Sequence, residues 1–235
     1  MIENRVCIAL DFQTMAEVQQ FLSSFKEQSL YVKVGMELFY GQGLPVIQMI
    51  KEMGHHIFLD LKLHDIPNTV YSAMKQLASL DVDMVNVHAS GGKKMMEAAK
   101  AGLEDGKRGK KRPLCIAVTC LTSLDQEILE QELSIVKPLD EVVLQLAKNT
   151  KEAGLDGIVC SPWESPIIHQ QVGDDFLTVT PGIREAKDST DDQKRIATPS
   201  VAKQLTSSYI VVGRSITRAS DPVATYRRIR ADFQE

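Results

Sequence analysis

Short runs of β-branched and other apolar residues alternate along this chain with longer stretches whose apolar positions recur every three or four residues. The first pattern is typical of buried strands and the second of helices with one buried side. Strands are expected at residues 6–11, 31–36, 56–62, 84–89, 113–121, 157–162, 176–183 and 209–215. The clearest amphipathic helices are expected at residues 15–28, 69–80, 93–105, 139–154 and 222–233. The pattern therefore predicts eight strand–helix units.

This regular alternation indicates the fold class, because parallel strands need a crossover helix between them. Eight units in 235 residues fit a closed barrel, which typically needs about 250 residues, better than an open sheet covered on both faces. No linker, sequence repeat or low-complexity segment divides the sequence. We therefore predict an α/β fold, a (β/α)8 TIM barrel, with residues 1–235 forming a single domain.

The third expected strand carries charged residues in an otherwise apolar run. Leu59, Leu61 and Leu63 alternate with Asp60 and Lys62. If the leucines face the helices, both charged side chains face the barrel interior. Burying charge costs free energy unless the charges are paired or used in chemistry. Both lie near the C-terminal end of the strand, where barrel enzymes carry their active sites.

Neighbouring segments bring further polar groups to the same end of the barrel. With the same inward parity they are Asp11, Lys33, Asn86 and His88, and Asp65 follows in the loop after the third strand. A network of ion pairs that only stabilises the barrel rim is one explanation, but apolar replacement of buried ion pairs is often equally stable. A lysine between carboxylates therefore favours a catalytic site, in which His88 is expected to be a core histidine rather than a base.

Composition and charge narrow the class of partners. The chain has 27 Lys and Arg against 31 Asp and Glu, a net charge of −4, so no overall field attracts nucleic acid or an anionic membrane. The basic run 107–112 has no interleaved aromatic residues and is expected to be a solvated loop.

The four cysteines, at positions 7, 115, 120 and 160, lie in apolar runs without C-x-x-C spacing, which predicts buried free thiols in a reducing compartment. The absence of a signal-peptide pattern and of apolar runs near ~18 residues predicts a cytoplasmic protein.

The segment DLKLHDIPNT, residues 60–69, resembles the D-x-K-x-x-D signature of the orotidine 5′-phosphate decarboxylase family. Other stretches resemble the same family in the family's order: ALD with Asp11, VKVG with Lys33, NVHA, VTCLTS, PGIR with Arg184, DQKR with Gln193 and VGRSIT with Arg214. The signature alone is shared with relatives that act on sugar phosphates. The full set, from residue 11 to residue 217, is very specific.

The resemblance implies a cofactor-independent decarboxylation of orotidine 5′-phosphate to uridine 5′-phosphate and CO₂, a step of pyrimidine biosynthesis, in a homodimeric barrel. Lys62 is similar to the family's proton donor to pyrimidine C6, and Asp60 to the carboxylate set against the departing CO₂. Lys33 and Asp11 resemble the residues that hydrogen-bond the ribose and complete the charged array.

Asp65 resembles the family residue that is donated across the dimer interface. Ile66 and Thr69 lie nearby in the sequence, and Thr69 is expected to contact the partner's substrate. Each active site would then need two chains.

A phosphate group is the expected anchor for such a substrate. After strand eight, Gly213 offers a backbone N–H and Arg214 a guanidinium, and barrels commonly bind phosphate after strands seven and eight. The polar segment 181–199 is too long for a tight connection and is predicted to be a mobile lid. By resemblance, Gln193 in this segment reaches the phosphate and Arg184 contributes at its base, while Thr122 recognises the pyrimidine edge.

Two other functions stay open at this point. A Mg²⁺-dependent sugar-phosphate decarboxylase or aldolase of the same superfamily would use Asp60, Asp65 and His64 as ligands, although an ammonium at Lys62 argues against a cation there. A non-enzymatic phosphosugar-binding protein would need the phosphate anchor but not a lysine between two acids. The residues favour the decarboxylase, with no cofactor and no metal.

Overall fold

The computed structural model describes residues 3–25, 28–184 and 196–234. Its strands are β1 (Val6–Ala9), β2 (Tyr31–Gly35), β3 (His56–Leu63), β4 (Met84–His88), β5 (Leu114–Val118), β6 (Gly157–Val159), β7 (Leu177–Thr180) and β8 (Tyr209–Val212). All the expected strands are present, and most end earlier than the pattern indicated. The residues that follow them belong to the loops at the C-terminal end of the barrel, where the sequence predicted the site.

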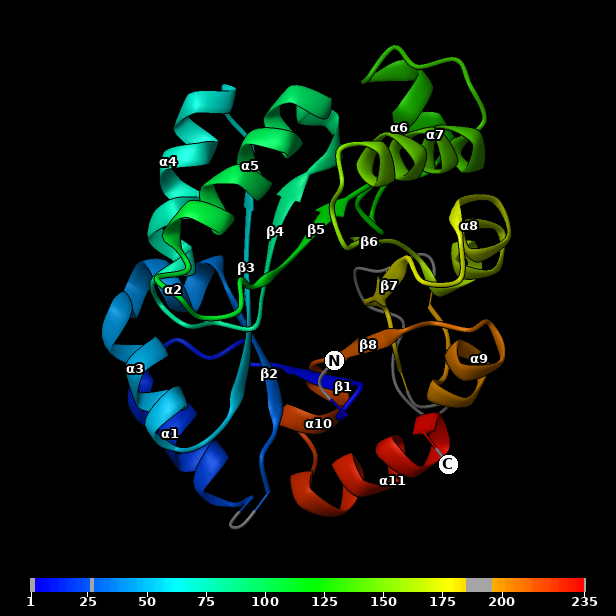
Figure 1. Cartoon of the computed structure of the whole chain (residues 1–235). Helices are drawn as coiled ribbons and strands as arrows, with labels where there is room; N and C mark the ends of the chain where they lie inside the picture. The colour runs from blue at the N-terminus through cyan, green and yellow to red at the C-terminus, as the bar shows by residue number, and fades with distance from the viewer. Residues whose placement is uncertain (1–2, 26–27, 185–195, 235) are drawn as a thin grey trace.

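Helices surround the strands (Figure 1). They are α1 (Met15–Ser23), α2 (Met36–Gln42), α3 (Leu44–Glu52), α4 (Pro67–Ala78), α5 (Lys93–Gly106), α6 (Gln126–Gln131), α7 (Leu139–Glu152), α8 (Ser165–Val172), α9 (Pro199–Gln204), α10 (Arg214–Thr217) and α11 (Pro222–Gln234). The five expected helices correspond to α1, α4, α5, α7 and α11, and α1 is shorter than expected. Several of the others are too short to produce a clear helical period.

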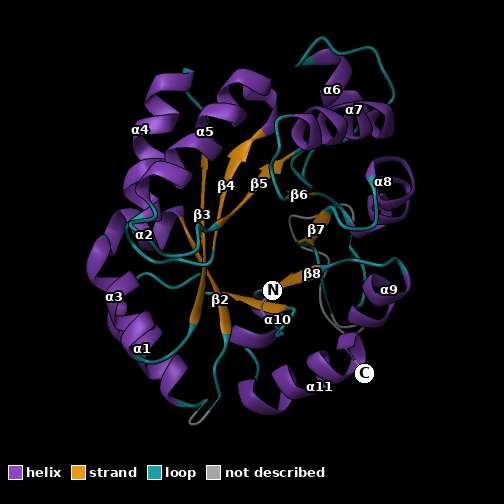
Figure 2. Ribbon diagram, viewed as in Figure 1, coloured by secondary structure: helices purple, strands orange, loops and turns teal. Residues whose placement is uncertain are grey.

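The strands close into a parallel barrel in the order β1 to β8, and β1 pairs with β8. Figure 2 shows the strands at the centre and the helices outside them. The predicted (β/α)8 TIM barrel is confirmed. Because the strands are parallel, their C-terminal ends meet at one mouth of the barrel.

Successive side chains of each strand point alternately into two separate apolar cores. Leu59 and its outward-facing neighbours pack in the large core between the strands and helices, whereas Phe58 packs with Tyr31 and Tyr209 in a smaller core inside the barrel. The predicted parity of the third strand is therefore correct. It places the side chain of Asp60 on the same inward face as Phe58, two residues closer to the mouth.

Helices α4 and α5 pack closely enough that side chains would not fit at two positions between them. A Cβ atom at Gly102 would lie 2.3 Å from the backbone oxygen of Tyr71, and one at Gly106 would lie 2.1 Å from that of Lys75. Glycine at both positions allows the backbones to approach. This contact fixes α4, whose first turn follows the loop that carries Asp65.

Three smaller expectations concern cysteines, membranes and the basic run. The four cysteines are buried free thiols, as predicted. Among the described residues, no helix combines the length and the apolar character needed to cross a membrane. The basic run lies in a loop as expected, but Arg112 is not merely solvated, because its guanidinium forms two hydrogen bonds of 2.6 and 2.7 Å with Asp156.

Candidate active site

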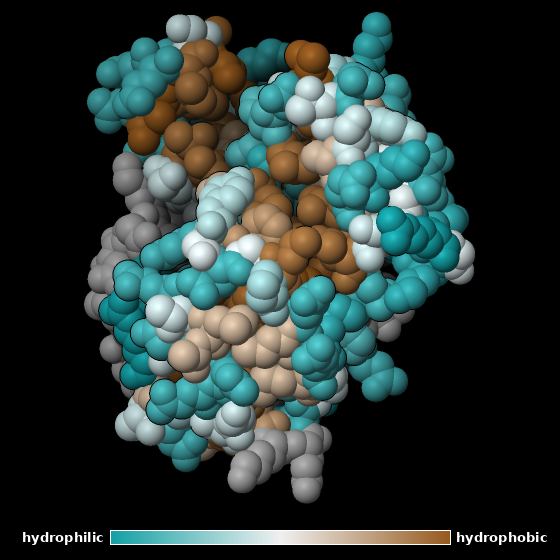
Figure 3. Space-filling model, turned by 90° about the vertical axis from the view of Figure 1, so that its left-hand side faces the viewer, coloured by the Kyte–Doolittle hydropathy of each residue, from teal (hydrophilic) through white to brown (hydrophobic). Residues whose placement is uncertain are grey.

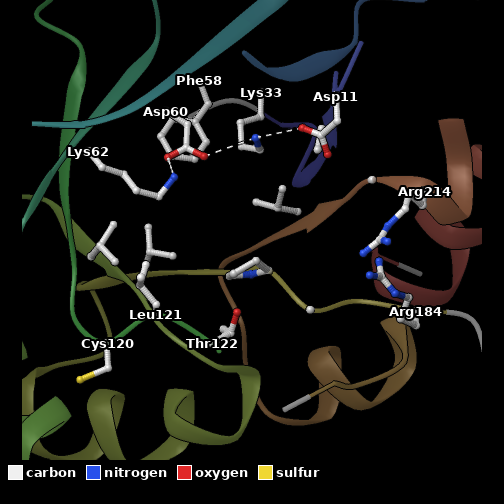
Figure 4. A pocket seen from close by; sticks show the side chains of 17 residues that line it. Asp11, Lys33, Phe58, Asp60, Lys62, Cys120, Leu121, Thr122, Arg184 and Arg214 are labelled. Carbon is white, nitrogen blue, oxygen red and sulfur yellow. Dashed lines mark hydrogen bonds and ion pairs between the residues drawn. The ribbon is translucent and has the colours of Figure 1, made fainter. Parts of the chain in front are cut away.

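Four side chains of alternating charge lie in a row at the mouth of the barrel (Figure 4). The Nζ atom of Lys62 donates to Oδ1 of Asp60 at 2.6 Å. The other oxygen of Asp60, Oδ2, lies 3.3 Å from Nζ of Lys33, and that Nζ lies 3.5 Å from Oδ1 of Asp11. The sequence predicted that these residues would meet, and the structure brings them together.

The end of β3 departs from regular strand geometry at Lys62. The backbone of this residue has φ of +51°, a left-handed conformation that costs a non-glycine residue about 1 kcal/mol or more. The pairing of β3 with β4 shifts register between Leu59 and Leu63. Strand alternation alone would not predict this geometry, which turns the lysine side chain toward Asp60.

Burial and the neighbouring charges shift the pKa values of Asp60 and Lys33 in opposite directions. Burial alone would raise the pKa of Asp60, but Lys33 and Lys62 lower it below its ordinary value. Burial alone would lower the pKa of Lys33, but Asp60 and Asp11 raise it above its ordinary value. Asp60 is therefore a carboxylate and Lys33 an ammonium at neutral pH.

The row borders a cavity of about 280 Å³. Of the predicted site residues, those that line it are Asp11, Lys33, Asp60, Lys62, Thr122, Arg184, Gly213 and Arg214. Sequence analysis missed the apolar part of the wall, which includes Phe58, Leu121, Val118, Val159 and Val211. Strand parity could have found Phe58, because it shares the inward face with Asp60. Apolar walls beside a few charged groups are typical of small-molecule sites, in which the charged groups fix the orientation of the ligand.

Two arginines, Arg184 and Arg214, line the cavity, and Figure 4 shows both toward the Asp11 end of the charged row, away from Lys62. Arg184 is buried, and its backbone N–H donates to the oxygen of Ala197 at 3.0 Å. This bond and the bridge between Ile183 and Ala197 join the two ends of the segment between β7 and α9. Residues 185–195 of the predicted lid, which include Gln193, lie outside the described residues.

The sequence as a whole matches a known family. A sequence model described as "Orotidine 5′-phosphate decarboxylase / HUMPS family" matches residues 4–229. The chain belongs to this family. The resemblance seen in the short motifs is thus confirmed over nearly the full length.

Proteins similar to this chain include named members of the family. A relative from Bacillus cytotoxicus named orotidine 5′-phosphate decarboxylase is 58% identical over 97% of this chain and 96% of its own length. A crystal structure of orotidine 5′-phosphate decarboxylase from Lactobacillus acidophilus, 46% identical, covers 99% of this chain and all of that one with a TM-score of 0.88. An uncharacterized conserved protein from Geobacillus kaustophilus, 49% identical, covers 97% of this chain and all of that one, also with a TM-score of 0.88.

Two residues predicted for the site of this family member do not line its cavity. Asp65 and Thr69 are both exposed and are absent from the wall. Oδ1 of Asp65 accepts the backbone N–H of Ile66 at 2.6 Å. Within one chain, the structure does not bring these residues together with Lys62.

The histidines near the site contact each other. The rings of His64 and His88 have centroids 5.5 Å apart. Burial, and then the charges of His64 and Lys62, lower the pKa of His88, which keeps it neutral at pH 7. Neither histidine lines the cavity.

The residues considered for a metal site have other partners. The two oxygens of Asp60 contact the ammonium groups of Lys62 and Lys33, and a carboxylate held by two cations is a poor ligand for a third. Within residues 3–25, 28–184 and 196–234, no three His, Cys, Asp or Glu side chains are grouped as metal ligands. The donor set near Lys62 therefore does not fit Mg²⁺.

Proposed function

We propose that the protein decarboxylates orotidine 5′-phosphate to uridine 5′-phosphate and CO₂ without a cofactor, in pyrimidine biosynthesis, and that residues 1–235 form one decarboxylase domain. The observation that carries this proposal is the row of alternating charges beside a partly apolar cavity, whose wall also contains two arginines. The relatives that bear this enzyme's name support it. Buried free thiols support a reducing compartment, and we propose the cytoplasm.

The chemical step would depend on Lys62. Heterolysis of the bond between C6 and the carboxyl carbon releases CO₂ and leaves the electron pair on C6, where the pyrimidine ring stabilises it poorly. An ammonium fixed beside C6 stabilises that charge more than it stabilises the substrate. Lys62 would then transfer a proton to C6 and recover one from solvent.

Asp60 would act by position and charge. Asp60 would lie close to the substrate carboxylate, and because Asp60 is ionised, the repulsion between the two would raise the energy of the bound substrate. Asp60 also accepts a hydrogen bond from the Lys62 ammonium at 2.6 Å. Stabilisation of the developing carbanion by a preorganised lysine ranks first in our mechanism, and repulsion of the substrate carboxylate ranks second.

A substrate bound against like charge needs binding energy from its unreactive parts. We propose that Arg214, Arg184, Gln193 and the N–H of Gly213 bind the phosphate. In the same pose Lys33 and Asp11 would hydrogen-bond the ribose. Thr122 would contact the pyrimidine edge.

A homodimer would supply the two predicted residues that are missing from the cavity. Asp65 lies in the loop before α4 and Thr69 in its first turn. Apolar surface is exposed on the side of the molecule that carries α2, α3 and α4 (Figure 3). Exposed on these elements and the loop before α4 are Met36, Tyr40, Leu44 and Ile66. Exposed apolar surface of this kind is typical of protein interfaces. We propose that a second copy of the chain covers it and receives Asp65 and Thr69 in its site.

The direct test is turnover of the proposed substrate. Orotidine 5′-phosphate is added to purified protein, and loss of its ultraviolet absorbance and formation of uridine 5′-phosphate are followed. We expect turnover at the same rate with and without an excess of chelator, because Lys62 rather than a metal would supply the positive charge. Tight binding of the substrate without product would support the non-enzymatic alternative instead.

Replacing Arg214 with alanine is expected to weaken substrate binding more than it slows the chemical step. A charge-assisted hydrogen bond contributes about 1.5–3 kcal/mol, so KM should rise about 10- to 100-fold. Steady-state kinetics measure both parameters, and the matched control is Arg227→Ala on the exposed side of α11. An unchanged KM in Arg214→Ala would remove this residue from the phosphate site.

A further inference from the structure

Asn86 connects Asp60 and Lys62, two neighbouring charged residues of the site, although it does not itself line the cavity. It lies in β4 and is 1% exposed. Its Oδ1 accepts the backbone N–H of Lys62 at 2.7 Å, and its Nδ2 donates to Oδ1 of Asp60 at 2.7 Å. One buried amide therefore holds both residues.

These bonds form a closed ring. The same oxygen of Asp60 that accepts from Asn86 also accepts from Nζ of Lys62, at 2.6 Å. The orientation of the amide follows from its partners, because a flipped amide would point its oxygen at a carboxylate and its NH₂ group at a backbone N–H. Only one orientation of Asn86 makes both hydrogen bonds.

The ring coincides with the irregular part of the sheet. Leu59 pairs with Val85 and Leu63 with Val87, so four steps along β3 correspond to two steps along β4. Asn86 lies opposite the extra residues of β3. Its side-chain oxygen accepts the N–H of Lys62 where a regular ladder would provide a backbone oxygen.

The amide also compensates for an unfavourable backbone conformation. Lys62 has φ of +51°, and such a conformation persists only when surrounding contacts hold it. Without the amide, the partly buried N–H of Lys62 would lose its acceptor, which favours relaxation of the end of β3. Asp60 would keep the two ammonium groups but lose its neutral donor.

We propose that Asn86 is a positioning residue, whose amide fixes Asp60 and Lys62 in the reactive arrangement before the substrate binds. The expected effect of Asn86 on turnover rests on the proposed decarboxylase function. The expected effect of Asn86 on the conformation of Lys62 is independent of that function. The two can therefore be tested separately.

The first test replaces Asn86 with leucine, which has a similar size and no polar atoms. We expect kcat to fall about 10²-fold, because a misplacement of about 1 Å has this effect, while KM stays within about threefold because the phosphate and pyrimidine contacts remain. The matched control is Asn4→Leu. Asn4 is also buried, donates to the Tyr226 hydroxyl at 2.6 Å and accepts the N–H of Val6 at 3.2 Å. This control should lose stability but keep kcat, and an equal fall of kcat in both variants would overturn the proposal.

A second variant, Asn86→Asp, keeps the shape of the side chain. The introduced carboxyl can still accept the N–H of Lys62, but it donates to Asp60 only when protonated. The charged and titratable groups around it are Asp60, Lys62, Lys33 and His88, and β5 contributes the apolar Ile116 opposite. We expect its kcat relative to wild type to rise as pH falls, because the protonated acid reproduces the donor of the amide. A ratio that is constant with pH would contradict the positioning role.

A crystal structure of Asn86→Leu tests, without an activity assay, whether Asn86 holds the conformation of Lys62. We expect Lys62 to leave the left-handed conformation and its Nζ to leave Asp60. If both are retained, the proposal is wrong even if the enzyme is active. If wild type does not turn over orotidine 5′-phosphate, the proposed function fails, and the Lys62 geometry of this variant still decides whether Asn86 holds it.

Discussion

Replacing Lys62 with alanine is expected to abolish turnover of orotidine 5′-phosphate, with kcat at least about 10⁴-fold below wild type. In the proposed mechanism, the variant loses both the charge beside C6 and the proton donor to C6. General acid catalysis contributes about 10²–10⁴ in rate, and a preorganised electrostatic donor contributes about 10²–10³. Water cannot replace the fixed charge, because the cation must be in place before the C6 charge develops.

The Lys62→Ala variant should still fold. Asp60 would keep Lys33 and the amide of Asn86 as partners, and alanine has the same backbone preference at φ of +51° as lysine. Thermal unfolding followed by circular dichroism should give a Tm within a few degrees of wild type. The control is Lys51→Ala, which removes a lysine paired with Asp81, outside the cavity wall, and should leave kcat unchanged. A Lys62→Ala rate equal to that of wild type would refute the mechanism.

The fold could be predicted because it depends on patterns local to each strand. Leu59 and Leu61 lie on one face of β3 and Asp60 on the other, and this alternation survives folding because a slip of one residue would bury the charges among the helices. The recurrence of such strands between helices then leaves few topologies. The same parity predicted that Asp60 and Lys33 would meet.

The geometry of the site depends on contacts between strands, which the sequence pattern does not contain. The left-handed backbone of Lys62 follows from the register shift between β3 and β4. For the same reason the two hydrogen bonds of Asn86 could not be foreseen, although its inward direction was. The apolar wall around Phe58 was not predicted, because the charged motifs that indicate the site do not indicate the apolar side chains that exclude water from it.

The proposed role of Asp65 in a second subunit differs in kind, because a single chain cannot contain that contact. Asp65 is exposed, and its backbone contact with Ile66 is local. Asp65→Ala should therefore leave the isolated fold intact but inactivate the enzyme, since each cavity would lack a carboxylate that helps to hold the charge of Lys62. Such a variant alone does not distinguish a residue of the same chain from one of the partner.

Mixing two inactive variants makes this distinction. If Asp65 acts across the interface, a dimer of one Lys62→Ala chain and one Asp65→Ala chain has one site with both substitutions and one site with neither. Random exchange makes half of the dimers mixed, so turnover should recover to about a quarter of wild type. If Asp65 acts within its own chain, every site carries one substitution and the mixture stays inactive.

The matched control mixes Lys62→Ala with Lys33→Ala, whose side chains line the same cavity of one chain. Because every mixed dimer would then have two defective sites, this control should show no recovery under either arrangement.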